Sequence, residues 1–121
     1  MATMRYLVND VEVSIAFYTA LGFEVTERMG PPFARVKLGD LNLWLSGPAS
    51  SAARALPDGS KPQPGGWNRL VIEVADLKAA VAEVKARGGR FRSEPIEGPG
   101  GWQAVCEDPS GNPIELFQPR R

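Results

Sequence analysis

The sequence contains no histidine and a single cysteine, Cys106, among its 121 residues. Without histidine it lacks the usual general base near neutral pH, the middle member of most nucleophilic triads and the commonest transition-metal ligand. A lone cysteine forms no intrachain disulfide, so we expect packing to stabilise the fold and the protein to be cytoplasmic. Any catalysis must therefore use side chains such as Glu, Asp, Arg, Lys, Tyr, Ser or Thr.

Net charge and long apolar runs are also missing. The 14 Lys and Arg residues balance 14 Asp and Glu residues, whereas a nucleic-acid binder needs a basic excess to neutralise phosphates. No apolar run approaches the ~20 residues that span a bilayer, and we expect no signal peptide. With 43% hydrophobic residues, we expect one soluble domain, 1–121, that binds neither nucleic acid nor membrane.

The chain contains an internal repeat. An offset of 66 residues aligns Asp10 with Asp76 and Gly22 with Gly88, together with the apolar positions between them. Each aspartate is suited to cap a helix N-terminus, and each glycine can take the left-handed conformation that ends a helix. The shared cap, apolar period and terminating glycine indicate a duplicated module.

Each copy is predicted to fold as a strand, a helix and three further strands. Alternating apolar residues precede each aspartate, as in a strand with one buried face, and apolar residues at three- and four-residue spacing follow it. The two modules span about 3–46 and 67–118. Their later strands are predicted at 23–28, 32–38 and 41–46, then at 90–94, 101–107 and 112–118.

The segment 47–66 joins the two copies and is rich in residues that break regular structure. Eleven of its 20 residues are Gly, Pro or Ser, so we expect no core element there. Two interpretations remain open. The segment is either a slack linker or a functional loop, because long loops in small domains are often functional. In the second case it is a lid that delivers Trp67 to the site.

With DPSGNPIELF at 108–117 and VNDVEVSIAFYTALGFEV at 8–25, the sequence resembles the vicinal oxygen chelate superfamily. That superfamily includes glyoxalase I, extradiol dioxygenases, fosfomycin-modifying enzymes and bleomycin-resistance proteins. The resemblance implies an α+β fold in which two βαβββ modules curl their strands into a cup-shaped mixed sheet, with the helices outside. It also implies a homodimer whose cavity is shared between the chains.

Catalytic members of that superfamily hold a divalent metal with four side chains, typically His and Glu. Strand parity and the repeat offset place Thr3, Trp44, Arg69 and Glu115 at these four positions. Only the glutamate is a good metal ligand, since the indole has no atom that can coordinate a metal and the guanidinium is a permanent cation. We therefore expect no metal and no other cofactor.

The same parity predicts which side chains line the cup, with Trp67 and Trp102 at strand starts beside it. The mixture of aromatic, cationic and acidic groups is suited to a flat, partly polar ligand. Alternatively, the aromatics fill a collapsed cup or a dimer interface, and Arg69 pairs with Glu115. The predicted ligand-binding residues are Arg5, Phe33, Arg35, Trp44, Trp67, Arg69, Glu73, Trp102, Gln103 and Glu115.

The leading hypothesis is a protein that binds or sequesters an aromatic or antibiotic-like small molecule, similar to the bleomycin-resistance branch. The alternative is a lyase, isomerase or dioxygenase-like enzyme that uses Glu115 or an atypical metal site. A lone carboxylate with no metal to polarise the substrate is a narrow basis for catalysis. Cys106 falls on the helix-facing side of its strand and is expected to be a core residue.

Overall fold

Two helices and two mixed sheets, neither closed into a barrel, make up residues 2–120, which the computed structural model describes. This confirms the predicted α+β class. The chain divides into two compact units, Met1–Gly65 and Gly66–Arg121. In each unit a strand and a helix precede further strands, in the order that the repeat predicts. No helix within the described residues is long and apolar enough to cross a membrane.

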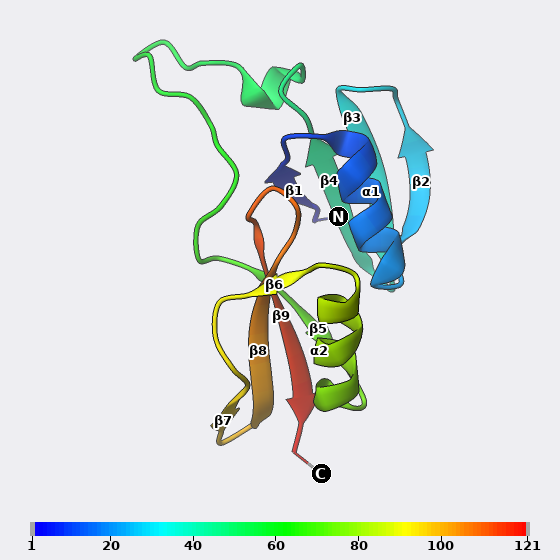
Figure 1. Cartoon of the computed structure of the whole chain (residues 1–121). Helices are drawn as coiled ribbons and strands as arrows, with labels where there is room; N and C mark the ends of the chain where they lie inside the picture. The colour runs from blue at the N-terminus through cyan, green and yellow to red at the C-terminus, as the bar shows by residue number, and fades with distance from the viewer. Residues whose placement is uncertain (1, 121) are drawn as a thin grey trace. The chain divides into compact units, whose positions relative to one another are not determined.

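In the first unit, α1 lies across one face of a four-stranded sheet with the order β1-β4-β3-β2 (Figure 1). β1 pairs with β4 in parallel, and the other neighbours are antiparallel. The first and last strands of the unit are therefore neighbours in the sheet. The elements are β1 (Met4–Leu7), α1 (Val11–Ala20), β2 (Glu24–Arg28), β3 (Phe33–Leu38), β4 (Leu41–Ser46) and the short 3₁₀ helix η1 (Ser51–Ala53).

The second unit repeats this topology, with the order β5-β9-β8-β6 and α2 on one face (Figure 1). One prediction was wrong here: the strand expected at 90–94 ends at Phe91, and β7 forms a separate strand against β8. Pro95 lies between these strands and has no N–H for a ladder. The elements are β5 (Leu70–Glu73), α2 (Leu77–Ala86), β6 (Arg90–Phe91), β7 (Ile96–Gly98), β8 (Gly101–Glu107) and β9 (Pro113–Pro119).

The two helices begin in the same way. The carboxylate of Asp10 accepts the Val13 N–H at 3.0 Å, and that of Asp76 accepts the Ala79 N–H at 3.1 Å. Each bond satisfies one of the amides that a first helical turn leaves unpaired. After the last turns, Gly22 has a φ of 103° and Gly88 a φ of 84°, which only glycine adopts without strain.

Each helix packs on one face of its own sheet and buries apolar side chains there. In the first unit Tyr18, Leu43 and Leu45 are fully buried; in the second, Ile114 and Cys106 are. Burial raises the pKa of the Cys106 thiol to about 12, so the thiol stays protonated at neutral pH. Since the thiolate is the reactive form, this cysteine is a core residue and no nucleophile. Of the predicted site residues that lie on strands, all but Trp102 are on the opposite sheet faces.

Candidate ligand-binding site

Three side chains form a row across the first sheet, on the face away from α1. The register sets Arg5 of β1 beside Trp44 of β4, and Trp44 beside Arg35 of β3. On the far side of Arg35, β2 contributes Glu27. Because directly opposed residues in a sheet point to the same face, these side chains share one surface. We call Arg5, Trp44 and Arg35 the Trp44 row.

The indole of Trp44 is held between two cations. The guanidinium carbon of Arg5 lies 5.1 Å from the Trp44 ring centroid, and that of Arg35 lies 4.7 Å from it. The Phe33 ring meets the indole edge-on at a centroid distance of 5.6 Å. Each cation–π contact is worth about 0.5–1 kcal/mol at an exposed site. The indole therefore has a fixed orientation before any ligand arrives.

The two arginines of the row differ in how their charge is compensated. Arg35 pairs with Glu27 at 3.1 Å, which partly neutralises it. Within residues 2–120, no carboxylate forms an ion pair with Arg5, whose side chain contacts the Trp44 ring. Arg5 therefore contributes an unbalanced positive charge to this face.

The corresponding row of the second sheet has different chemistry. Glu115 of β9 lies between Val71 of β5 and Val105 of β8, and only 8% of it is exposed. Two guanidinium nitrogens of Arg69 lie 2.8 and 2.9 Å from one Glu115 oxygen. A third Arg69 nitrogen donates to the Trp67 carbonyl at 3.3 Å. The ion pair that the sequence offered as an alternative to ligand binding is thus present.

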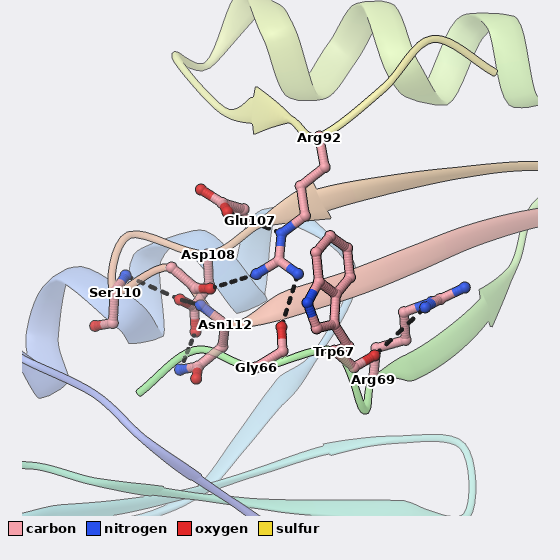
Figure 2. Close-up of polar contacts among 9 residues, drawn as sticks. Gly66, Trp67, Arg69, Arg92, Glu107, Asp108, Ser110 and Asn112 are labelled. Carbon is pink, nitrogen blue, oxygen red and sulfur yellow. Dashed lines mark hydrogen bonds and ion pairs between the residues drawn. The ribbon is translucent and has the colours of Figure 1, made fainter. Parts of the chain in front are cut away.

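Trp67 lies against a residue that the sequence analysis did not select, Arg92 (Figure 2). The Arg92 guanidinium carbon is 4.4 Å from the Trp67 ring centroid. Its nitrogens donate to Glu107 at 2.9 Å, to the Gly66 carbonyl at 2.7 Å and to the Gly111 carbonyl at 3.0 Å. Trp67 is 69% exposed, and one face of its indole rests on a fixed, planar cation.

The turn at 108–112 supplies part of that support (Figure 2). Asp108 is 2% exposed, and its carboxylate accepts the backbone N–H groups of Ser110 and Asn112 at 2.8 and 2.9 Å. It also accepts the Asn112 side-chain amide at 3.0 Å. This buried network fixes the turn and hence the Gly111 carbonyl that Arg92 binds. The DPSGN segment thus acts structurally, behind the Trp67 position.

Trp102 does not lie where the sequence analysis placed it. It pairs with Gln118 on β9, which puts it on the face that carries α2, opposite Glu115 and Gln103. There it lines a cavity of about 500 Å³ together with Leu77 and Pro95. The prediction that all three tryptophans lie in or beside the cup is therefore wrong for Trp102. Parity was ambiguous because Trp102 follows a glycine pair at the strand start.

The remaining predicted residues lie on the candidate faces. Glu73 and Gln103 flank Phe117, on the same side of the second sheet as Glu115. Phe33 is next to Ser46 on the same side of the first sheet as Trp44. Whether these residues bind a ligand stays a prediction.

The four positions that the resemblance assigns to metal ligands do not suit a metal here. Thr3 is exposed just before β1, Trp44 lies between two arginines, and Arg69 occupies an oxygen of Glu115. Indole and guanidinium groups provide no ligand for a divalent cation. Among residues 2–120, no three His, Cys, Asp or Glu side chains are grouped so as to bind a metal ion.

Comparison with known proteins identifies relatives of this chain. Residues 1–116 match the model of the Glyoxalase/Bleomycin resistance protein/Dioxygenase superfamily. An uncharacterized protein of Mycolicibacterium smegmatis is 31% identical over 113 residues, which cover 92% of this chain and 86% of that protein.

Solved structures with the same fold include proteins of different function. TnmS3, an antibiotic binding protein from Streptomyces sp. CB03234, is 28% identical with a TM-score of 0.69, over 99% of this chain and 97% of that one. Lactoylglutathione lyase from Agrobacterium tumefaciens is 21% identical with a TM-score of 0.71, over 97% and 92%. Since a binding protein and an enzyme share the fold, function must be argued from the side chains.

Proposed function

Because this chain belongs to the Glyoxalase/Bleomycin resistance protein/Dioxygenase superfamily, we propose that it binds a planar aromatic or antibiotic-like small molecule without using a metal. The observation that carries the proposal is the Trp44 row. There an indole lies between two guanidinium groups, at a position that the resemblance assigns to a metal ligand.

The Trp44 row is well suited to recognising a flat molecule. Aromatic side chains bury a large area at a small cost in conformational entropy. Here the Phe33 edge and the two arginines restrain the indole beforehand, so binding orders less. Guanidinium planes also stack on aromatic rings. A planar ligand can therefore contact the indole, the Phe33 ring and the guanidinium groups of one preformed surface.

The state of Glu115 supports binding over catalysis. A general base needs a carboxylate that is free to take a proton from a substrate. The Glu115 carboxylate is nearly buried and one of its oxygens already accepts two Arg69 donors. One observation supports the alternative of an enzyme acting through Glu115. This carboxylate is buried on the candidate face, and buried carboxylates are common in active sites.

The proposal extends to assembly and location, where it rests on the resemblance and the composition. We propose a cytoplasmic homodimer in which the two modules form one domain and a ligand cavity is shared between chains. Light scattering coupled to gel filtration tests the dimer. A monomer at micromolar concentration would contradict this part of the proposal and leave the Trp44 row untouched.

The decisive experiment measures ligand affinity by calorimetry after a tryptophan-quenching screen of planar aromatic antibiotics and metabolites. For a ligand found in this way, Trp44→Ala should lower the affinity at least tenfold, which is about 1.4 kcal/mol. Trp102→Ala is the matched control, because Trp102 lies on the opposite face of its sheet, and its affinity should equal that of wild type. Equal affinity of Trp44→Ala and wild type would refute the proposed site.

A second measurement separates binding from catalysis. Elemental analysis of the purified protein should find no stoichiometric Ni, Zn, Mn or Fe, and Glu115→Gln should change ligand affinity only modestly. A stoichiometric metal, or a turnover that Glu115→Gln abolishes, would favour the enzyme.

A further inference from the structure

A second pocket lies within the first unit, between the end of its sheet and the segment that follows β4. Its volume is about 480 Å³, within the range of small-molecule sites. Leu7 and Ser46 contribute the ends of β1 and β4, and Ala53 and Pro64 belong to the covering segment. Lys61 is the one charged residue in its lining. Six of the ten lining residues are apolar and four are polar, a mixture that suits a partly polar ligand.

Ser46 gives this pocket an unusual polar group. Its side chain is fully buried, and its hydroxyl is the single buried side-chain polar atom without a hydrogen-bond partner in the described part of the chain. Ser14 is equally buried, yet its hydroxyl donates to the Asp10 carbonyl at 2.7 Å. An unpaired buried hydroxyl is destabilising. Its presence in a pocket wall is explained if a ligand supplies the missing partner.

The covering segment is held in place at its start. The Gly47 N–H donates to the Pro32 carbonyl at 2.9 Å, and the Ser50 hydroxyl donates to the Gly47 carbonyl at 2.7 Å. Further along, the Leu56 N–H donates to the Ser60 carbonyl at 2.8 Å. The first two bonds anchor the start of the segment and the third closes a turn within it, which favours a functional loop over a slack linker.

We infer that this pocket is a second ligand site, which takes a small planar carboxylate and pairs one of its oxygens with the Ser46 hydroxyl. The hydroxyl needs an acceptor, and the lining contains a lysine and no acid, so an anionic acceptor is favoured. Leu7, Ala53 and three prolines suit an apolar, planar body. This inference goes beyond the Trp44 row and does not depend on it.

The test uses 2-naphthoate as the probe, with calorimetry for affinity and NMR for location. Wild-type protein should bind it at millimolar concentration or below, with intermolecular NOEs to the methyl groups of Leu7 and Ala53. Ser46→Ala should weaken binding about fivefold, the effect of one lost hydrogen bond. The same substitution should raise the Tm of the free protein by about 3 °C, because it removes an unpaired hydroxyl.

Ser14→Ala is the matched control, since it removes a buried hydroxyl that has a partner. It should lower the Tm and leave the affinity for 2-naphthoate unchanged. Absent binding, absent NOEs to Leu7 and Ala53, equal affinity of Ser46→Ala, or a Tm that falls in Ser46→Ala would each overturn the inference. Trp44→Ala should leave the NOEs to Ala53 intact, so this site and the Trp44 row can fail separately.

Discussion

The two sheets share a topology but carry opposite chemistry at corresponding places. In the first, an aromatic ring lies between two cations, as Arg5, Trp44 and Arg35. In the second, a carboxylate lies between two apolar side chains, as Val71, Glu115 and Val105. Both central residues come from the last strand of their unit. In the sheet, β4 lies between β1 and β3, and β9 lies between β5 and β8.

This difference separates what the backbone determines from what the side chains determine. The parallel pairing of first and last strands determines which three positions form a row. The identity of the central residue then decides whether the row needs a counter-charge. Trp44 takes cations from its own row, whereas Glu115 takes one from Arg69, which precedes β5. Three sets of substitutions test how far the two units differ, in order of decreasing effect.

Removing Arg69 should cost most, because it leaves Glu115 charged and nearly buried between two valines. We expect Arg69→Met to lower the free energy of unfolding by about 2–3 kcal/mol, below the value for fully buried pairs since Arg69 is partly exposed. Urea denaturation measures this. The double variant Arg69→Met/Glu115→Leu should recover most of the loss, as replacement of a whole buried pair often does.

Arg87→Met is the control for charge removal alone. Arg87 pairs with Glu83 at 2.9 Å on the surface of α2, and exposed pairs of this kind are worth less than about 0.5 kcal/mol. If Arg69→Met were no more destabilising than Arg87→Met, Glu115 would not depend on its counter-charge.

Removing Arg92 should cost less, about 1–2 kcal/mol, although Arg92 also donates to three groups. Its carboxylate partner, Glu107, has a side chain 25% exposed against 10% for Glu115, so water can replace the lost partner more readily. Arg92→Met should also lower the fluorescence anisotropy of Trp67, measured in a background without the other tryptophans.

Arg92→Lys distinguishes planar support from charge. Lysine keeps the positive charge but has neither the fork of donors nor the flat surface. Trp67 should therefore be nearly as mobile in Arg92→Lys as in Arg92→Met. Wild-type anisotropy in Arg92→Lys would show that charge alone holds the indole.

The helix caps should show the smallest effect and no difference between the units. Asp10→Ala and Asp76→Ala each remove one cap bond of nearly equal length, so each should lower the free energy of unfolding by about 1 kcal/mol. Thermal unfolding of the two variants gives the comparison. Asparagine at either position should restore most of the loss, and a large inequality between the alanine variants would break the equivalence of the two modules at this point.

The sequence was informative wherever local chemistry repeats. The aspartate caps, the glycines at 22 and 88 and the strands 41–46 and 101–107 all lie where they were predicted. These features depend on neighbours within a few residues or on side-chain alternation along one strand. Both are visible in a single sequence, and the duplication showed each of them twice.

The features that the sequence missed depend on residues distant along the chain. Arg92 acquires its role from Gly66, Glu107 and Gly111, and no local pattern marks it. The face of Trp102 depends on its pairing with Gln118. The Ser46 hydroxyl is distinguished by the absence of a hydrogen-bond partner in the described residues, and no spacing rule in the sequence predicts such an absence.

The anchoring of Gly47 indicates which residues can be mutated to change the ligand preference of this protein. A Cβ at position 47 would lie 3.0 Å from a Val11 methyl and 3.1 Å from the Pro31 carbonyl oxygen, so this residue is constrained. Residues 54–64 are mostly exposed, so we expect them to tolerate change, as surface loops do. Libraries that vary 54–64 while keeping Gly47 should therefore diversify ligand preference without eroding the fold, which makes this segment the natural entry point for directed evolution.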